Sequence, residues 1–529
     1  MSAEHANQGG RGSRGNRANR GGRHRNAGRP NGDGSGRGRG NSGNDRGRPG
    51  PREHRPAGRV SAARLAAYDV LRDVDEREAY ANLALPARIR EAGLNPRDAA
   101  FVTELVSGTL RGRGRYDRII ELASSREMDR IDPRTRNVLR LGAHQLLAMR
   151  TADHAALNES VELQRLVANA AGAGFVNGVL RAISRSTDAE WNDRIDAEAP
   201  SADAALAART SHPGWILRAL RDALAAEGRV DELHALLAAD NRAPRVSLAL
   251  LPGSGIDVDT AEALGGEAGI AVAGPSPLGL ELAGGDPGRA IDDLDLPEGT
   301  LRVQDQGSQL AALALLRASE IRAGEQWLDL CAGPGGKTAV LAAEAELMGA
   351  ELRANEVAEH RAELVRRAVV ASSDAVHVVS HDGREPEAFG DGGPANGGTR
   401  RYDRILVDAP CSGLGALRRR PEARWRKAPS DLPELTRLQA ELLDAAADHL
   451  ADDGLLAYVT CSPHLAETRV VLDRLLAKRS ELEELDAKAV LNRIAREPLD
   501  LAGDARSAQL WPHRNGTDAM FIALLRRRS

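Results

Sequence analysis

Apolar residues between positions 60 and 190 recur with the period of an α-helix. The run DPRTRNVLRLGAHQLL shows how such a helix begins, because Asp132 is a suitable N-cap and Pro133 suits the first helical position. An earlier run has an apolar face with i, i+3, i+4, i+7 spacing, and Ser61 is its candidate cap. This face contains Ala67, Val70, Leu71 and Val74. Strand signals are nearly absent, so residues 60–190 are predicted to form an all-helical domain.

The pattern changes twice further along the chain. Residues 191–240 are helical and polar, which is typical of a bridge between domains. Residues 241–300 contain two short strand candidates, PRVSLALLPG and GIAVAG, among glycines and prolines. Residues 191–300 are therefore expected to form a helical bridge and a small α+β segment.

From Gln304 onward, short apolar runs alternate with helical runs. The strand candidates are residues 326–332, 352–357, 375–382, 403–410, 454–461 and 519–526. Such alternation is typical of an α/β domain with a mostly parallel sheet. We therefore expect a multidomain chain, in which a Rossmann-like α/β domain over residues 301–529 follows the all-α domain.

Composition agrees with this division. A chain of 529 residues, of which 42% are hydrophobic, is long enough for two or three domains. Its three cysteines, Cys331, Cys411 and Cys461, make no disulfide framework, which suits a reducing cytosol. No run of about 18 apolar residues and no N-terminal apolar signal region occurs. A cytoplasmic protein without a membrane segment is expected.

Charge is distributed unevenly, because residues 1–59 carry 14 arginines, no lysine and four acidic residues. This segment has a net charge of +10, 16 glycines and no aromatic residue, whereas the remaining chain has 58 basic and 72 acidic residues. Such a composition cannot bury apolar surface and predicts a disordered tail. Arginine-glycine tails bind RNA phosphates, but a solubilising tail has the same composition.

The stretch LDLCAGPGGKT, residues 328–338, follows a strand candidate and opens a helix. A phosphate-binding P-loop would need glycine where this chain has Cys331, and a dinucleotide fingerprint would need glycine in place of Thr338. The remaining alternatives are a plain tight turn and a loop that binds S-adenosylmethionine, in which glycines let the backbone approach the cofactor. Three glycines and a proline at the expected sheet edge favour the S-adenosylmethionine loop.

Two acidic residues follow the next two strand candidates. Glu356 lies 20 residues after Gly336, the offset expected for a carboxylate that binds ribose hydroxyls. Asp382 ends the third strand candidate, where a side chain can meet an adenine edge. Either acid alone is more often a cap or a solvated residue. Together they predict a nucleoside site at the carboxyl edge of the sheet.

Two cysteines stand just beyond two strand candidates, in the runs YDRILVDAPCSG and LAYVTCSPH. Because the fourth and fifth strands of a doubly wound sheet are neighbours, Cys411 and Cys461 are expected to reach one cleft. The Asp-Ala-Pro-Cys run that begins at Asp408 departs from the Asp/Asn-Pro-Pro-Tyr/Phe motif of exocyclic-amine methyltransferases. A thiol suits carbon-5 of a pyrimidine instead, because thiolate addition to carbon-6 makes carbon-5 nucleophilic, and Asp408 can hydrogen-bond the ring nitrogen. The alternative is a pair of buried, inert thiols.

The stretches DLCAGPGGKT, DAPCSGLGALRRRPEARW and TCSPHLAET resemble motifs of the bacterial Sun (Fmu, or RsmB) family of ribosomal RNA cytosine-5 methyltransferases. QDQGSQLAA resembles the stretch that precedes this family's catalytic sheet. In the helical part, NVLRLGAHQLL and FVNGVLR resemble the NusB-like RNA-binding domain that the family carries at its N-terminus. The resemblance covers roughly residues 60–527 and is most specific in 328–338 and 408–425.

The resemblance implies roles for individual residues. Cys461 of the TCS motif is the expected nucleophile, Cys411 of the PCS motif is expected to assist product release, and Asp408 is expected to stabilise the adduct. DNA cytosine-5 methyltransferases attack with the PC thiol instead, so a chain with both thiols matches the RNA class. The residues implied for the S-adenosylmethionine site are Cys331, Ala332, Gly333, Pro334, Gly335, Gly336, Lys337, Glu356, Arg361, Asp382 and Asp408.

A basic loop, LRRRPEARWR, follows the PCS motif. Arginine can grip phosphates and tryptophan can stack on a base, so Arg418, Arg419, Arg424 and Trp425 are the predicted RNA ligands. A solvated basic loop is the alternative. Two stretches depart from the family pattern, because VSLALL replaces Leu-Arg-Val-Asn and DAMFIALL replaces Asp-Gly-Phe-Phe.

These observations predict an S-adenosylmethionine-dependent cytosine-5 methyltransferase that acts on RNA, with 16S (small-subunit) ribosomal RNA as the expected substrate. The target base has to be unstacked to admit a thiol at carbon-6. We expect a monomer that binds neither a metal nor a membrane. Another RNA, such as transfer RNA, and a non-catalytic RNA-binding scaffold remain alternatives, although the intact Cys411, Cys461 and Asp408 disfavour the scaffold.

Overall fold

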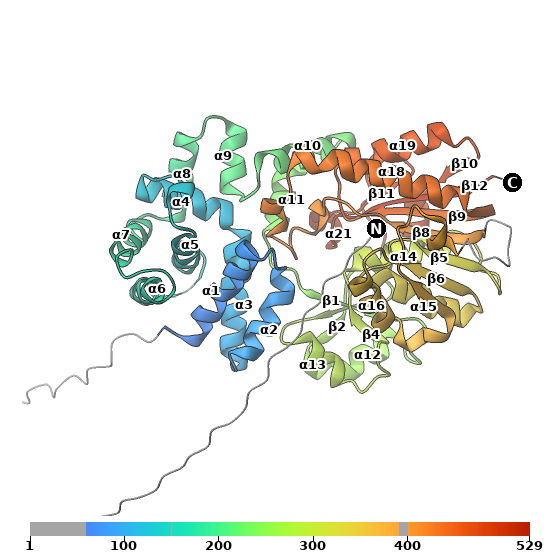
Figure 1. Ribbon diagram of the computed structural model, residues 1–529, viewed down its shortest axis with the longest axis horizontal. Helices are drawn as coiled ribbons and strands as arrows, with labels where there is room; N and C mark the ends of the chain where they lie inside the picture. The colour runs from blue at the N-terminus through green and yellow to red at the C-terminus, as the bar shows by residue number, and fades with distance from the viewer. Residues whose placement is uncertain (1–59, 150, 391–399, 529) are drawn as a thin grey trace, which may run out of the picture. The chain divides into compact units, whose positions relative to one another are not determined.

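The computed structural model describes residues 60–149, 151–390 and 400–528, so the prediction of a disordered tail lies outside the described residues. The first helices form the predicted helical domain (Figure 1). Both predicted N-caps are confirmed, because the Ser61 and Asp132 side chains accept hydrogen bonds from backbone amides three residues on. The helices are α1 (Ala62–Glu76), α2 (Ala81–Glu91), α3 (Pro96–Arg111), α4 (Arg113–Ser124), α5 (Pro133–Leu147), α6 (Asp153–Val167) and α7 (Ala173–Ile183).

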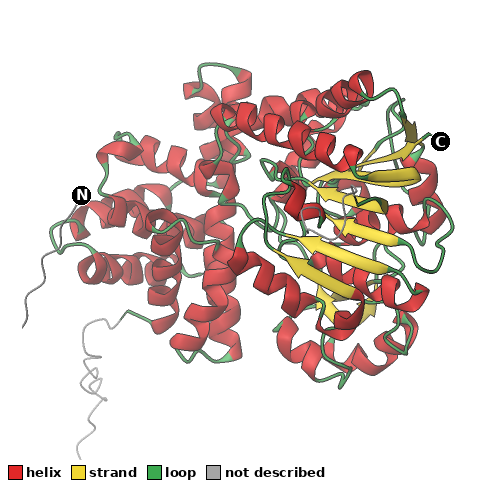
Figure 2. Cartoon of the chain, turned by 45° about the vertical axis from the view of Figure 1, so that its right-hand side comes forward, coloured by secondary structure: helices red, strands yellow, loops and turns green. Residues whose placement is uncertain are grey.

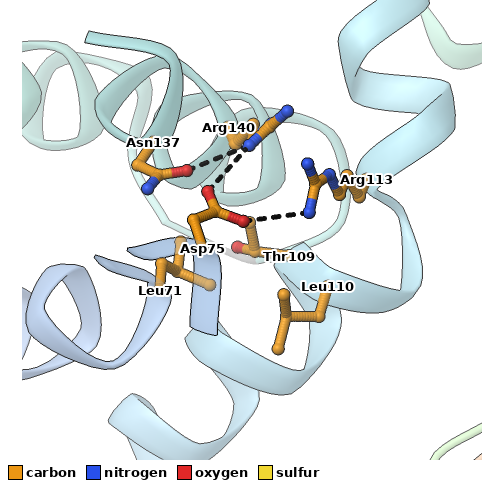
Figure 3. A pocket seen from close by; sticks show the side chains of 7 residues that line it. All are labelled: Leu71, Asp75, Thr109, Leu110, Arg113, Asn137 and Arg140. Carbon is orange, nitrogen blue, oxygen red and sulfur yellow. Dashed lines mark hydrogen bonds and ion pairs between the residues drawn. The ribbon is translucent and has the colours of Figure 1, made fainter. Parts of the chain in front are cut away.

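A cavity of about 10 Å³ in this domain lies among α1, α3, α4 and α5 and has room for no more than one water molecule. Figure 3 shows Asp75 of α1 pointing between Arg113 and Arg140, with which its carboxylate makes hydrogen bonds of 3.0 and 3.4 Å. Asn137 accepts a further hydrogen bond from Arg140. The cavity is therefore part of an ion-pair network that joins helices, and it is too small for a ligand.

Further helices and a small sheet follow, as the sequence predicts for this segment. The helices are α8 (Asp188–Glu198), α9 (Ala202–Arg209), α10 (Gly214–Ala226), α11 (Leu233–Asp240), α12 (Val258–Gly265) and α13 (Pro287–Asp292). The sheet has the antiparallel order β2-β3-β1-β4. Its strands are β1 (Val246–Leu250), β2 (Ile270–Val272), β3 (Gly279–Leu282) and β4 (Leu301–Val303). Of these strands, only β1 and β2 were predicted.

The second sheet has the order β10-β12-β9-β8-β5-β6-β7, with β11 paired to β12. Strands β5 to β9 pair in parallel, whereas β10, β11 and β12 pair in antiparallel fashion. All six predicted strands are present, and β10 and β11 were not predicted. The strands are β5 (Gln326–Asp329), β6 (Glu351–Asn355), β7 (Val376–Val379), β8 (Tyr402–Asp408), β9 (Leu450–Thr460), β10 (Leu482–Leu485), β11 (Ala508–Gln509) and β12 (Phe521–Arg527).

Helices cover both faces of this sheet, as Figure 2 shows. Successive residues of β9 alternate between two cores: Leu456 packs in one of them and Ala457 in the other. The helices are α14 (Gln306–Arg317), α15 (Gly336–Met348), α16 (Glu359–Ala368), α17 (Ala423–Arg426), α18 (Leu432–Asp448), α19 (Arg469–Lys478), α20 (Ala487–Ile494) and α21 (Pro512–Asn515). None of the helices in the described ranges has the length and apolarity needed to cross a membrane.

Candidate functional site

The carboxyl ends of parallel strands bring the predicted site residues to one edge of the large sheet. Strand β5 pairs with both β6 and β8, and β8 pairs with β9, so these strand ends lie side by side. The loop after β5, Glu356 after β6, Asp408 at the end of β8 and Cys461 after β9 therefore gather at this edge. The prediction that the strands preceding the two cysteines are neighbours is confirmed.

The two thiols are in direct contact. The Sγ atoms of Cys411 and Cys461 lie 3.4 Å apart, within hydrogen-bonding distance for sulfur. This contact raises the pKa of Cys411, to which burial adds, and it lowers the pKa of Cys461 against the opposing effect of burial. Cys461 is therefore the sulfur better able to exist as a thiolate, and Cys411 is the one that keeps its proton.

Lys337 and Asp408 form an ion pair close to the thiols. The Nζ of Lys337 lies 2.7 Å from Oδ2 of Asp408. Burial disfavours the ammonium form, but the Asp408 carboxylate raises the pKa of Lys337, so this side chain stays charged. The contact with Cys411 lowers the pKa of Cys461 most, burial and the Asp408 carboxylate raise it, and the charge of Lys337 lowers it. The sequence placed Lys337 only in the cofactor loop, and its electrostatic effect on the thiol was not predicted.

Close contacts within the chain require two glycines in the loop after β5. A Cβ atom at Gly333 would lie 2.1 Å from Oε2 of Glu356, and one at Gly335 would lie 2.5 Å from the Cβ of Ala368. Gly335 also has a φ of 101°, which L side chains rarely adopt. Because α15 begins at the next residue, Gly336, its free backbone N–H groups lie beside the loop.

Glu356 and Arg361 hold the loop from two sides. The Gly333 amide donates to Oε2 of Glu356 at 3.0 Å, and Nη2 of Arg361 donates to the Gly333 carbonyl at 2.7 Å. Arg361 and Glu356 also form an ion pair at 3.3 Å. Both residues therefore lie at the loop, as predicted. Contact of Glu356 with a ribose stays a prediction.

The other predicted cofactor residues lie around the same loop. Burial raises the pKa of Cys331, so its thiol stays protonated. The Ala332 amide donates to the Asn355 carbonyl at 2.8 Å and ties the loop to β6. Asp382, beyond the end of β7, is partly exposed, and a hydrogen bond from Arg384 lowers its pKa. A ligand at Asp382 would have to share or replace this ion pair.

Two buried polar residues near the loop were not predicted. Asp329 ends β5, accepts a hydrogen bond from Oγ1 of Thr338 at 2.7 Å, and has its pKa raised to about 7 by burial. Gln304 is 5% exposed, and neither polar atom of its side chain has a hydrogen-bond partner among the described residues. Its amide carbon lies 3.7 Å from the position of a Cβ atom at Gly336. The signal was present in QDQGSQLAA and DLCAGPGGKT, but nothing in those stretches shows which polar residues are buried.

The structure contradicts the prediction that Arg424 contacts RNA. This side chain is fully buried, so no phosphate can reach it. Its guanidinium donates to the carbonyl oxygens of Arg111, Ser211 and Asp240 at 2.9–3.1 Å and to Oδ1 of Asn241 at 2.7 Å. Arg424 therefore caps the ends of helices that come from distant parts of the sequence.

The other predicted RNA ligands are also engaged within the chain. Arg419 forms an ion pair with Asp518, and Arg418 donates to the Gly516 carbonyl at 3.0 Å. The Trp425 ring packs so closely on Gly114 that a Cβ atom there would lie 2.5 Å from the ring. The Arg419 side chain still has 42% of its surface exposed, so an RNA contact by this residue stays a prediction.

The family model described as 16S rRNA methyltransferase RsmB/F matches residues 316–526, and the NusB family model matches residues 61–185. The Mycobacterium tuberculosis (strain H37Rv) protein named "Putative methyltransferase Rv1407" is 44% identical over 481 residues, which cover 90% of this chain and 99% of that protein. The Escherichia coli (strain 536) protein named "Ribosomal RNA small subunit methyltransferase B" is 30% identical over 424 residues, which cover 79% of this chain and 90% of that protein.

The crystal structure of the protein PH0851 has the same fold, with a TM-score of 0.70 at 21% identity, and the match covers 88% of this chain and 98% of that one. The predicted fold class, a helical NusB-like domain followed by an α/β methyltransferase domain, is thereby confirmed. By its sequence and by the arrangement of its domains, the chain belongs to the RsmB/F family of 16S rRNA methyltransferases.

Proposed function

We propose that this protein is an S-adenosylmethionine-dependent RNA cytosine-5 methyltransferase in which Cys461 is the nucleophile. The observation that carries the proposal is the 3.4 Å contact between Cys461 and Cys411. The contact favours a thiolate on Cys461, and the ion pair of Lys337 and Asp408 lies close to it. A plain pair of inert structural thiols would not need this charged neighbour.

The residues of the site suit an S-adenosylmethionine-type cofactor. Such a molecule presents ribose hydroxyls and an amino-acid part, which need a carboxylate and free polar groups at the sheet edge. Glu356 supplies a carboxylate at the end of β6, and Gln304 supplies an unpartnered buried amide beside the start of α15. Asp382 supplies a second, partly exposed acid beyond β7.

The chemistry of the chain's own residues follows from their positions. The Cys461 thiolate adds to carbon-6 of the cytosine, which forms a C–S bond and moves the electron pair of the 5,6 double bond to carbon-5. The ring nitrogen of the adduct takes a proton from water, which it returns when the adduct breaks down, and the Asp408 carboxylate accepts a hydrogen bond from this N–H and stabilises the adduct. When bound, S-adenosylmethionine supplies the electrophilic methyl group for carbon-5. A base then takes the carbon-5 proton, the double bond forms again and the C–S bond breaks, with Cys411 assisting this release.

The substrate proposed for this reaction is 16S ribosomal RNA. It is supported by the name of the family model and by the relative named ribosomal RNA small subunit methyltransferase B. The helical domain, which matches the NusB family, supports an RNA partner because the resemblance noted in the sequence makes it an RNA-binding domain. We further propose a cytoplasmic protein that works as a monomer, without a metal.

The test is methyl transfer by the full-length protein from labelled S-adenosylmethionine to protein-free 16S RNA. Wild type is expected to label one cytosine at carbon-5, and Cys461→Ala is expected to lose this transfer. Cys411→Ala is expected to accumulate a covalent RNA–protein adduct that survives denaturing electrophoresis. Label at a different atom, or full activity in Cys461→Ala, would refute the mechanism. If only transfer RNA is labelled, transfer RNA and not 16S RNA is the substrate. If the protein binds RNA but methylates none, the scaffold alternative is favoured.

A further inference from the structure

A buried carboxylate joins the two segments that carry the thiols. Each cysteine is followed by a serine, and the Oγ atoms of Ser412 and Ser462 lie 3.0 Å apart. Both serines are buried, with 3% and 0% exposure. The segments after β8 and β9 are therefore in contact at two points, once at their thiols and once at their hydroxyls.

Glu467 lies under both hydroxyls and is fully buried. Its Oε1 accepts the Ser412 amide at 2.7 Å and the Gln439 side-chain amide at 3.4 Å. Its Oε2 accepts the Ser412 hydroxyl at 2.5 Å and the Ser462 hydroxyl at 2.7 Å. Four donors from three segments of the chain thus converge on one carboxylate.

The two partners of Oε1 are N–H groups, which only donate, whereas the two hydroxyls at Oε2 can donate or accept. A glutamine at the same position could keep its oxygen toward the N–H groups and turn its NH₂ group toward the hydroxyls, so that Glu467→Gln mainly removes the charge. Within the described parts of the chain, no ion pair joins Glu467 to a basic side chain, so hydrogen bonds alone compensate its burial. A buried charge held only by hydrogen bonds is costly, which indicates that the carboxylate has a purpose beyond packing.

The charge of Glu467 acts on one thiol of the pair. After the contact with Cys461 and burial, Glu467 is a further cause of the raised pKa of Cys411. The charges that act most on Cys461 are those of Asp408, which raises its pKa, and of Lys337, which lowers it. The charged or titratable groups around the two sulfurs are Lys337, Asp408, Arg419, Tyr458, Glu467 and Asp518.

We propose that Glu467 is a positioning residue that clamps the two thiol-bearing segments together and makes Cys461, rather than Cys411, the attacking sulfur. Only the attack on cytosine rests on the proposed function. The ranking of the two thiols is a property of the protein alone, so it can be measured without RNA or cofactor.

The experiment compares full-length Glu467→Gln with wild type in alkylation by iodoacetamide, with each cysteine quantified by peptide mass spectrometry across a pH series. Wild type is expected to react first at Cys461. Glu467→Gln is expected to lower the ratio of Cys461 to Cys411 alkylation at neutral pH by about tenfold, which corresponds to a relative shift of one pH unit. The control is Glu325→Gln, because Glu325 is also a buried glutamate, but it is bound to Arg404 and Trp327 at the other end of β5.

An unchanged ratio and pH profile in a folded Glu467→Gln variant would overturn the proposal, and so would an equal change in Glu325→Gln. If Glu467→Gln does not fold, Ser462→Ala tests the clamp in its place, because this variant removes the Ser462 hydroxyl and leaves the Glu467 carboxylate. Ser462→Ala is expected to lower the same ratio, and an unchanged ratio would overturn the clamp. A further outcome is that wild type methylates no RNA while Glu467→Gln still lowers the ratio of Cys461 to Cys411 alkylation. That pair of results would uphold the clamp and refute only the proposed function.

Discussion

The ammonium group of Lys337 lies 2.7 Å from the carboxylate of Asp408 and so joins the loop after β5 to the end of β8. The pair brings both charges close to Cys461: the Asp408 carboxylate raises the pKa of this thiol, and the Lys337 ammonium group opposes that effect. The contact with Cys411 is therefore the main reason why Cys461 is the better nucleophile of the two thiols.

Lys337→Met removes the positive charge and keeps the length of the side chain. The pKa of Cys461 is then expected to rise, because Lys337 is one of the groups that lower it. The pH profile of Cys461 alkylation should move toward alkaline pH by about one unit, which is about tenfold in rate at neutral pH. Lys478→Met is the control, because Lys478 is exposed and pairs with Asp444 on the surface. A profile that matches wild type would show that the ion pair does not act on the thiol.

Gly415→Ala is expected to disrupt the site through the backbone. The Gly415 amide donates to the Cys461 carbonyl at 2.8 Å, and its carbonyl accepts from the Ala519 amide at 2.9 Å. An added Cβ atom would lie 1.9 Å from the Ala519 carbonyl oxygen, so one of these segments has to move. We expect a loss of stability of about 3 kcal/mol or more, measured by urea unfolding. Gly178→Ala in α7 should be neutral or stabilising, because nothing lies within 4 Å of its added Cβ atom.

The position of the thiol pair was predictable from the sequence for a physical reason. Apolar runs that end in Asp408 and in Thr460 mark parallel strands, and the carboxyl ends of parallel strands share one edge of a sheet. The offset from Gly336 to Glu356 identified a second strand end in the same way. Regular patterns thus located the residues that lie directly at strand ends.

Residues buried by segments from distant parts of the chain were not predictable. Arg424 and Arg420 stand in the same basic run, yet one is fully buried under helix ends and the other is exposed. Glu467 stands in the polar stretch HLAETR, which reads as surface until Ser412 and Ser462 are brought to it. The local sequence shows the spacing of apolar residues and the residues that favour turns. It does not show which polar side chain a distant segment will bury.

Asp329→Asn tests a consequence of burial at the end of β5. Burial raises the pKa of Asp329 to about 7, well above its ordinary 3.8, so the folded protein holds this proton more tightly than the unfolded chain does. The contribution of protonated Asp329 to the free energy of unfolding is therefore fully present below pH 4 and is lost as the pH rises toward 7. The expected loss is about 1.4 kcal/mol per pH unit over this window.

Asparagine at position 329 cannot ionise, and its Oδ1 can still accept the hydrogen bond from Thr338. Between pH 4.5 and pH 7.5, the free energy of unfolding of Asp329→Asn should therefore rise relative to that of wild type by about 3 kcal/mol. Urea unfolding at these two pH values measures the difference. A constant difference between the variants at both pH values would mean that Asp329 is ionised throughout.

Arg424→Ala separates a structural role from an RNA contact. The variant leaves three backbone carbonyl groups and the Asn241 side chain without their donor, so we expect a loss of stability of about 3–5 kcal/mol. Arg420→Ala is the matched control, because Arg420 is exposed and stacks over Tyr80. Thermal unfolding and RNA affinity are measured for both variants at the same salt concentration, below the unfolding temperature. If Arg424 instead gripped a phosphate, its variant would keep wild-type stability, lose RNA affinity and show a weaker salt dependence of binding.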